Sequence, residues 1–186
     1  GGMTVRTIAC LPALVGAWKH HGGGAILSTS GTYDWPNDAL TRPDLSPRGT
    51  RAINMNQLGE ALVGSLSGPP VKALYVYNSN PAAVAPNLRL VRQGLLRDDL
   101  FTVVHELFPT DTVDYADIVL PATSQLEHVD IHGSYGHHEV MYNAPVIAPL
   151  FECRSNNDVF RSLAARLGFE ADLFPDDDAL IREALA

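Results

Sequence analysis

KALYVYNSNP (Lys72–Pro81) is the first of three apolar runs that decide the fold of this chain, and LFTVVHELFPTDT (Leu100–Thr112) and ADIVLP (Ala116–Pro121) are the others. Each run has the composition of a strand and ends abruptly in small, polar or proline residues. We expect helical stretches between the runs, near residues 84–96 and 111–116. Strands that alternate with helices form βαβ units with right-handed crossovers, so the sequence predicts a parallel sheet.

The expected fold class is α/β: a parallel sheet with helices on both faces, a Rossmann-like or flavodoxin-like three-layer arrangement, with irregular flanking segments. Ligands of such sheets lie beyond the carboxyl ends of the strands. The expected strands cover residues 72–77, 100–104 and 117–120. The expected segments are an N-terminal arm, an α/β core, and an irregular connection followed by C-terminal helices, at residues 1–50, 51–128 and 129–186.

Helical periodicity also appears outside the three runs. It predicts helices at Thr4–Trp18, Asn54–Ser65 and Asn157–Leu167 and a last short helix that begins at Asp176–Asp178. Residues 29–51 and 129–150 are expected to be irregular. One face of the second helix is expected to carry Met55, Leu58 and Leu62. The side chains expected to face inward in the third helix are Val159, Phe160, Leu163, Ala164 and Leu167.

Composition limits the class of protein. The 186 residues are 46% hydrophobic and 18% charged, and no apolar run approaches the roughly 20 residues that span a bilayer. A formal charge of -8 without a Lys/Arg cluster argues against nucleic acid as a partner. Cys10 and Cys153 are too few for a four-cysteine zinc or iron–sulfur site, and we expect reduced thiols in a cytoplasmic chain, with a periplasmic parent as the alternative.

Polar side chains follow two of the expected strands. Asn78, Ser79 and Asn80 precede a helix, so they are suited to hydrogen-bond a ligand while the helix N-terminus offers unpaired N–H groups to a phosphate. An ordinary Asn- and Pro-rich turn is the alternative. His105 and Glu106 end the next strand, where a carboxylate can accept bonds from sugar hydroxyls or from guanine N1–H and N2–H. A capped turn is the alternative there, and Thr110–Thr112 is expected to begin a helix.

The remaining polar clusters carry no familiar catalytic pattern. Glu127 and His128, with the string His132, His137, His138 and Glu139, lack the HExxH spacing and are expected in a surface loop. No GxSxG elbow, Walker loop or GxGxxG fingerprint occurs. We therefore expect neither a catalytic residue nor a metal ligand in this chain.

The order of the segments closely resembles the molybdopterin oxidoreductase family, also called the dimethyl sulfoxide reductase or bis-molybdopterin guanine dinucleotide family. ADIVLP followed by Glu127 is the strongest single part of the resemblance. The matching stretches are LPALVGAWKHHGGG (Leu11–Gly24), ALYVYNSNP (Ala73–Pro81), FTVVHELFPTDTVDYADIVLP (Phe101–Pro121), TSQLEHVDIHGSYG (Thr123–Gly136) and RSNNDVFRSLAARLG (Arg154–Gly168).

The resemblance implies an internal fragment of a large catalytic subunit that carries out two-electron chemistry at molybdenum or tungsten. The core would bind the guanosine end of a molybdopterin guanine dinucleotide, and residues 1–50 would come from a neighbouring domain of the parent. The implied partners are the cofactor and the remaining domains of the parent, and the fragment alone would be inactive and retain no cofactor. Family contacts fall on Asn78, Ser79, Asn80, His105, Glu106, His128 and Asn156.

The sequence departs from the family at several of these contacts. Asn78 stands where glycine is frequent, the pair His105–Glu106 replaces one that usually contains Asp, and Asn156 is often Asp in relatives. Two other functions compete with the cofactor hypothesis. One is a free-standing nucleotide- or flavin-binding α/β module, which flavin or NAD(H) retained through purification would indicate. The other is a non-catalytic structural or interaction domain, which would bind no nucleotide.

Overall fold

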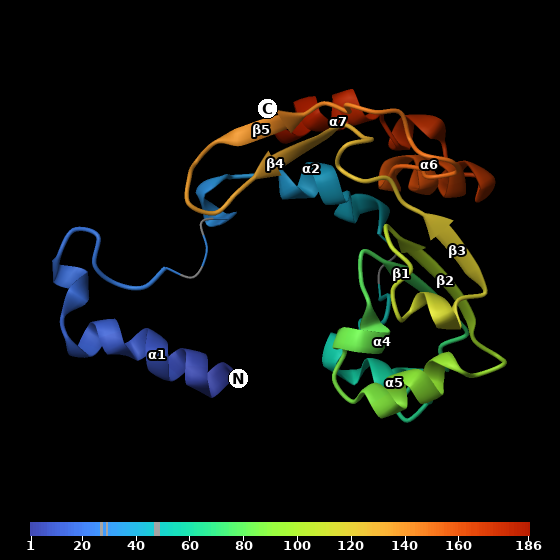
Figure 1. Ribbon diagram of the computed structural model, residues 1–186, viewed down its shortest axis with the longest axis horizontal. Coiled ribbons are helices and arrows are strands. Elements are labelled where there is room, and N and C mark those ends of the chain that lie inside the picture. The colour runs from blue at the N-terminus through green and yellow to red at the C-terminus, as the bar shows by residue number, and fades with distance from the viewer. Residues whose placement is uncertain (27, 29, 47–48) are drawn as a thin grey trace. The chain divides into compact units, whose positions relative to one another are not determined.

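A parallel sheet is the centre of the computed structural model, which describes residues 1–26, 28, 30–46 and 49–186 (Figure 1). Its strands are β1 (Ala73–Tyr77), β2 (Phe101–Glu106) and β3 (Ile118–Pro121), in that order. Tyr77 pairs with His105, and His105 pairs with Leu120, so the carboxyl ends of the strands lie side by side. The expected parallel α/β fold is confirmed. β2 continues two residues further than expected, because His105 and Glu106 themselves take part in the pairing with β3.

Besides the strands, the structure contains short helices and 3-10 turns. The α-helices are α1 (Gly2–Leu14), α2 (Asn37–Thr41), α3 (Leu58–Leu62), α4 (Pro81–Val84), α5 (Leu88–Leu95), α6 (Asn156–Arg166) and α7 (Asp177–Ala184). The 3-10 turns are η1 (Ala17–Lys19), η2 (Ser30–Thr32), η3 (Pro43–Leu45), η4 (Met55–Gln57), η5 (Val113–Tyr115) and η6 (Ala171–Leu173).

The chain forms two compact units. Residues 1–35 and 131–141 form the first, and residues 36–130 and 142–186 form the second, which contains the parallel sheet. These boundaries differ from the three expected segments. Residues 36–50 and 142–186 join the sheet unit because α2 contacts α7 and because α6 packs on the sheet.

The first unit contains α1, which has no buried residue. It also holds most of a hairpin of β4 (Asp130–Gly133) and β5 (Val140–Asn143), which form a separate two-stranded sheet. Residues 129–150 are therefore less irregular than expected. Residues 29–51 contain α2, η2 and η3 where an irregular connection was expected, although residues 29, 47 and 48 lie outside the described part of the chain.

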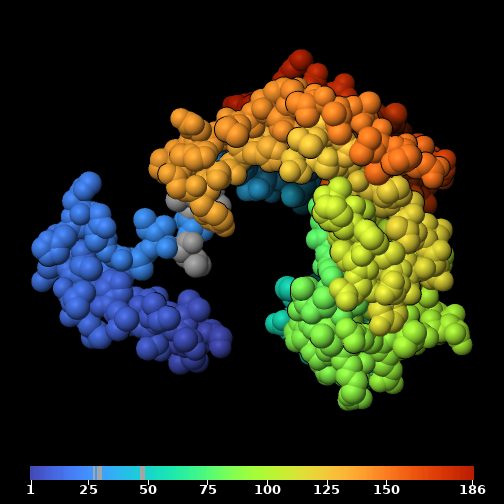
Figure 2. Space-filling model, in the orientation of Figure 1, coloured from blue at the N-terminus to red at the C-terminus, as the bar shows by residue number. Residues whose placement is uncertain are grey.

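One face of the sheet unit carries the hydrophobic core, which consists of Leu62, Ala82, Val91, Leu95 and Leu100. Val91 and Leu95 are four residues apart on α5, so one helix face delivers both to the core. The segment with α4, α5 and the strands, coloured green to yellow, forms a continuous packed body in the space-filling view (Figure 2).

The single helix expected at residues 84–96 is divided into α4 and α5. Pro86 has no N–H to donate and disfavours a helical conformation at the residue before it. Ala85 is accordingly extended, with ψ of 144°, and Asn87 adopts the left-handed conformation before α5 begins. The division lets two short helices cover the core.

The opposite face of the sheet is covered in part by α6. Its Phe160 ring lies 5.7 Å from the Tyr75 ring and 5.3 Å from the Tyr77 ring, measured between centroids. Tyr75 and Tyr77 are two residues apart on β1 and so share one face of the sheet. Helices therefore lie on both faces, as expected.

Burial on the predicted helix faces is less complete than the periodicity indicates. Val159 and Ala164 of α6 are buried, but Leu167 is 74% exposed because it lies at the C-cap. Phe160 and Leu163 are covered only in part, at 38% and 37% exposed, because α6 covers only part of the sheet. Met55 is 78% exposed, since it belongs to η4, whose tighter turn rotates it away from the face that carries Leu62. The expected start of the last helix is confirmed: Asp176 caps α7 by accepting a bond from Ala179 N at 2.8 Å.

Candidate functional site

The candidate site lies along the carboxyl edge of the parallel sheet. Asn78 directly follows β1, and His105 and Glu106 end β2. Beyond β3, Ala122 forms an isolated parallel bridge with Arg154, which adds a short third pairing to the two pairings of the sheet. Asn156 follows that bridge by two residues, so the topology brings most of the predicted residues to the same edge.

Asn78 and Ser79 present their side chains to solvent at this edge. Asn78 has φ of 49°, a left-handed conformation that Asn adopts more readily than most residues. Its backbone N–H donates to His105 O at 3.4 Å, which ties the loop to β2. Within the described residues, neither side chain has a hydrogen-bond partner. Both are therefore available to a ligand.

Asn80, by contrast, is engaged inside the protein. Its Oδ1 accepts bonds from Thr112 Oγ1 at 2.7 Å and from Thr112 N at 3.2 Å. Its Nδ2 donates to Asp111 Oδ2 at 3.0 Å. The sequence pattern did not reveal this connection, because Thr112 was expected only to begin a helix.

The expectation that the N-terminus of α4 offers unpaired N–H groups to a phosphate is wrong. Pro81 has no N–H, and Ala82 N donates to Thr112 Oγ1 at 3.1 Å. Ala83 N and Val84 N both donate to Asn80 O. All N–H groups of the first turn are therefore satisfied within the chain, and none remains for a phosphate.

His105 is fully buried within an aromatic cluster that also contains Tyr75, Tyr77 and Phe160. Tyr75 Oη lies 3.3 Å from Nδ1, whereas Nε2 makes no hydrogen bond of normal geometry within the described chain. Burial lowers the pKa of His105, and the nearby charge of Glu106 and the Arg154 carbonyl oppose that shift. The ring is therefore neutral at neutral pH and closed to a ligand in this conformation.

Glu106 is half-buried and keeps acceptor capacity. Its Oε1 accepts a bond from Leu107 N at 2.7 Å, which fixes the carboxylate at the end of β2. For Oε2 there is no hydrogen bond in the described part of the chain. This oxygen is suited to accept a bond from a donor placed beyond the sheet edge.

His128 is connected to the carboxyl edge of the sheet by a hydrogen bond with Thr123, whose Oγ1 lies 2.8 Å from the His128 Nδ1. The neighbouring Glu127 is buried and structural. Its Oε2 accepts from Ser124 Oγ at 2.7 Å and Ser124 N at 2.8 Å, and its Oε1 accepts from Leu150 N at 2.7 Å. The bonds from Ser124 and then Leu150 hold the pKa of Glu127 below its usual value. The Ser124-x-x-Glu127 spacing of a capping box was a signal for this turn.

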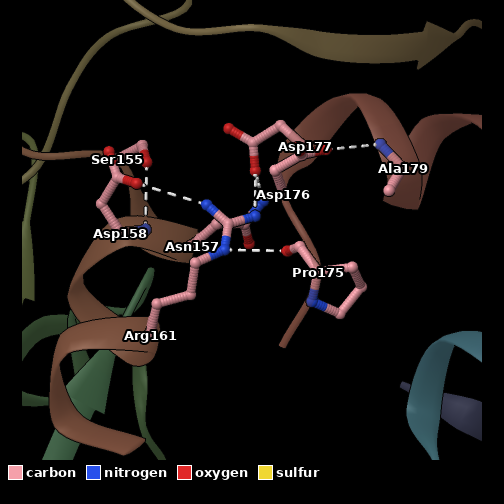
Figure 3. A network of polar contacts seen from close by, with 8 residues as sticks. All are labelled: Ser155, Asn157, Asp158, Arg161, Pro175, Asp176, Asp177 and Ala179. Atoms are coloured by element: carbon pink, nitrogen blue, oxygen red, sulfur yellow. Dashed lines mark hydrogen bonds and ion pairs between the residues drawn. The ribbon is translucent and has the colours of Figure 1, made fainter. Parts of the chain in front are cut away.

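A polar cavity of about 580 Å³ adjoins His128. Thr123, Arg154 and Ser155 line one part of it, and Arg161 lines another. Figure 3 shows that Arg161 is already occupied: Nη2 bonds Asp177 Oδ1 at 2.6 Å and Nε bonds Pro175 O at 2.9 Å. The Arg154 guanidinium makes no such contact to any described residue. Of the two arginines that line the cavity, Arg161 is therefore neutralised by Asp177, whereas the charge of Arg154 is available to a ligand.

Asn156 begins α6 beside this cavity. The preceding Ser155 caps the helix, with its Oγ accepting from Asp158 N at 3.2 Å (Figure 3). Asn157, the next residue, bonds Asp177 Oδ1 at 2.7 Å. The start of α6 is thus held to α7, and Arg154, two residues before Asn156, forms the bridge to Ala122 beside Thr123.

Two further features bear on the class of site. Across the described ranges, no group of three or more His, Cys, Asp or Glu side chains is arranged to hold a metal ion. None of the helices described is both long and apolar enough to cross a membrane.

Comparison with protein families shows a match to the molybdopterin oxidoreductase model over residues 1–166. The chain is 54% identical to the probable oxidoreductase YoaE of Bacillus subtilis (strain 168), an alignment that covers all of this chain and 27% of that protein. It is 31% identical to the dimethyl sulfoxide/trimethylamine N-oxide reductase of Cereibacter sphaeroides over 85% of this chain and 18% of that protein.

The chain is also similar in fold to a solved structure. Acetylene hydratase from Pelobacter acetylenicus matches 78% of this chain and 22% of its own, with a TM-score of 0.57 and 25% sequence identity. The chain spans about a quarter or less of the length of these relatives.

Proposed function

The chain belongs to the molybdopterin oxidoreductase family, and we propose that it binds the guanosine part of a molybdopterin guanine dinucleotide within a larger parent subunit. The observation that carries this proposal is the row of unengaged polar groups at the carboxyl edge of the sheet. Asn78, Ser79 and the Oε2 of Glu106 lie there, at the edge where ligands of parallel α/β sheets bind.

The proposed contact set is drawn from that implied by the family resemblance. Besides the groups just named, it includes His128 and Asn156 beside the polar cavity. The resemblance also implies His105 and Asn80, but His105 is buried and the Asn80 side chain is bonded to the neighbouring loop, so we assign both to holding the site in place rather than to contact with the ligand. The mixture of exposed donors and acceptors suits a sugar and a base edge better than a metal ion.

Guanine specificity is assigned to Glu106. A carboxylate oxygen accepts bonds from guanine N1–H and N2–H, whereas adenine offers no such pair of donors. The bond from Leu107 N holds the carboxylate in place before a ligand arrives, which reduces the entropy lost on binding.

The cofactor, when bound to the parent, supplies a molybdenum or tungsten centre for two-electron chemistry. The residues of this chain would bind and orient its nucleotide end. The remaining domains of the parent are the proposed partners, which the greater length of the relatives supports. We also propose a cytoplasmic location, for which the two free thiols Cys10 and Cys153 are the support.

The test is an NMR amide titration of the 186-residue chain with GDP and, separately, ADP. We expect selective GDP shifts at Asn78–Asn80 and at Glu106, even where affinity is only millimolar, which corresponds to about 4 kcal/mol. Glu106→Gln keeps the shape and the bond to Leu107 N but loses the negative acceptor. It should weaken GDP binding about tenfold.

Glu183→Gln is the matched control, because Glu183 is an exposed residue of α7 and lies outside the proposed contact set. It should bind GDP as the wild type does. Equal shifts for GDP and ADP, or unchanged GDP affinity in Glu106→Gln, would remove the assigned role of Glu106. The absence of shifts with either nucleotide would contradict nucleotide binding by this chain.

A further inference from the structure

Thr112 is fully buried and is bonded to the C-terminal end of the loop that carries Asn78 and Ser79 and to the first turn of α4. Its hydroxyl donates to Asn80 Oδ1 at 2.7 Å and accepts from Ala82 N at 3.1 Å. Its backbone N–H also donates to Asn80 Oδ1, at 3.2 Å. Thr112, in the loop between β2 and η5, is thus joined to Asn80 by two bonds and to the first turn of α4 by a third. We call Asn80 and Thr112 the loop clasp.

Asp111 fixes the orientation of the clasp. Its carboxylate accepts from Asn80 Nδ2 at 3.0 Å, which leaves Asn80 Oδ1 to face Thr112. A rotated amide would place Nδ2 against the Thr112 N–H and its oxygen against the carboxylate, both repulsive. The bond from Asn80 also lowers the pKa of Asp111, so the carboxylate is ionised at neutral pH. The Asn80 side chain therefore has one orientation.

The loop clasp lies at one end of a segment, Asn78–Ser79, whose backbone is strained at Asn78. Asn78 has a positive φ, a conformation that is costly for residues other than glycine and persists when its surroundings hold it. One side of the segment is held by the bond from Asn78 N to His105 O, which is long at 3.4 Å. On the other side, the clasp holds Asn80 and the first turn of α4. Asn78 and Ser79 lie between these anchors with free side chains.

We propose that the loop clasp positions Asn78 and Ser79 for the ligand, and that Asn80 and Thr112 are positioning residues rather than ligand contacts. Each polar group of the Asn80 side chain is already bonded within the protein, which leaves the ligand-facing role to the two preceding residues. The inference rests on the proposed function only for the identity of the ligand. The effect of the clasp on the conformation of Asn78 and Ser79 can be tested whether or not the proposed function is correct.

The test compares substitutions of two buried threonines. Thr112→Val keeps the volume and removes both bonds of the hydroxyl, and Thr112→Ser restores them. Thr102→Val is the matched control, since Thr102 is equally buried but its Oγ1 has no partner in the described chain. All three variants are measured in the 186-residue chain by amide hydrogen exchange and by 15N relaxation.

We expect Thr112→Val to raise the exchange rate of the Asn78 amide at least about tenfold and to lower the order parameters of Asn78 and Ser79. The Cα shift of Asn78 should lose its left-handed signature. Thr112→Ser and Thr102→Val should both resemble the wild type. Ordered, left-handed Asn78 in Thr112→Val would overturn the inference, as would an equal effect of Thr102→Val.

GDP titration of the same variants separates positioning from general stability. Thr112→Val should weaken GDP binding about tenfold or more, and Thr112→Ser should recover it. Val91→Ala, a core substitution in α5, should lower stability and leave GDP affinity unchanged. A loss of GDP affinity in Val91→Ala as large as that in Thr112→Val would contradict positioning. If the wild type itself fails to bind GDP, the proposed function is contradicted. The exchange and relaxation data still test whether the clasp orders Asn78 and Ser79.

Discussion

His105 illustrates how a single residue changes meaning between sequence and fold. Its place at the end of β2 favours contact with a ligand, yet the rings of Tyr75, Tyr77 and Phe160 surround it and leave no exposed surface. Burial disfavours the charged imidazolium and lowers its pKa, and Glu106 only partly opposes this. The neutral ring is thus part of the structure that holds α6 on the sheet.

This burial predicts a pH dependence of stability. A His whose folded-state pKa lies below the unfolded value of 6.5 stabilises the fold fully above that value. Stability is then lost as the pH falls from about 6.5 toward the folded-state pKa, because the unfolded chain takes up the proton first. We expect the urea midpoint of the sheet unit to fall between pH 7 and pH 5.5, above the range where carboxylates titrate.

His105→Phe should remove this dependence, because Phe suits the aromatic cluster and has no proton to bind. His20→Gln is the control, since His20 is exposed, and it should leave the slope unchanged. A wild-type midpoint that is constant over this range, or a slope that persists in His105→Phe, would show that His105 does not titrate as argued.

At the scale of elements, the close contact of α3 with α5 depends on two glycines. A Cβ at Gly94 would lie 2.3 Å from the Leu62 Cβ, and a Cβ at Gly59 would lie 2.8 Å from the Leu90 Cβ. Real Cβ atoms do not approach so closely, so the two backbones pack where only glycine fits. The same contact brings Leu62 against Val91 and Leu95 in the core.

Gly94→Ala should therefore destabilise the protein, although alanine favours helix by about 1 kcal/mol. We expect the free energy of unfolding to fall by about 1–3 kcal/mol, because the helices must separate or distort. Gly31→Ala, at a glycine with no atom in reach of the new Cβ, should change it by less than about 0.5 kcal/mol. Urea denaturation measures both, and equal or greater stability of Gly94→Ala would contradict the packing argument.

At the scale of the whole molecule, burial is concentrated in the sheet unit. α1 has 13 residues, includes Pro12 and buries no side chain, whereas β2 contains the fully buried Thr102 and Val104. An isolated helix of this length is marginal in water. Apolar residues of α1, such as Ile8 at 60% exposure, are available for contact with other chains.

Hydrogen exchange of the isolated chain should show this contrast directly. We expect protection factors in α1 to be at least about 100-fold lower than those of β2, because only the strands require global unfolding to exchange. Protection of α1 equal to that of β2 would mean that the helix is covered, and a concentration series would show whether self-association covers it. Independence from concentration would exclude that explanation.

The strands and their parallel order followed from the sequence, because apolar runs, β-branched residues and turn residues act locally and are visible in a short window. The Asp176 cap and the resemblance to the family could also be predicted, because both depend on short stretches of sequence. The division at Pro86 had a local signal that the helical periodicity masked. Helix faces were less predictable, since the exposure of Phe160 and Leu163 depends on how much of the sheet α6 covers.

What the sequence by itself determined is the class of the fold, the family, and the edge at which polar residues gather. Only the tertiary structure decided which of those residues are free. Asn80 bonds Thr112, which is 32 positions away, and His105 is covered by the Phe160 ring of α6. Neither contact can be predicted from a short stretch of sequence. Hydrogen bonds and ring contacts between distant segments exist only after the backbone has brought them together, and they satisfy the α4 N–H groups that a local pattern assigns to a ligand.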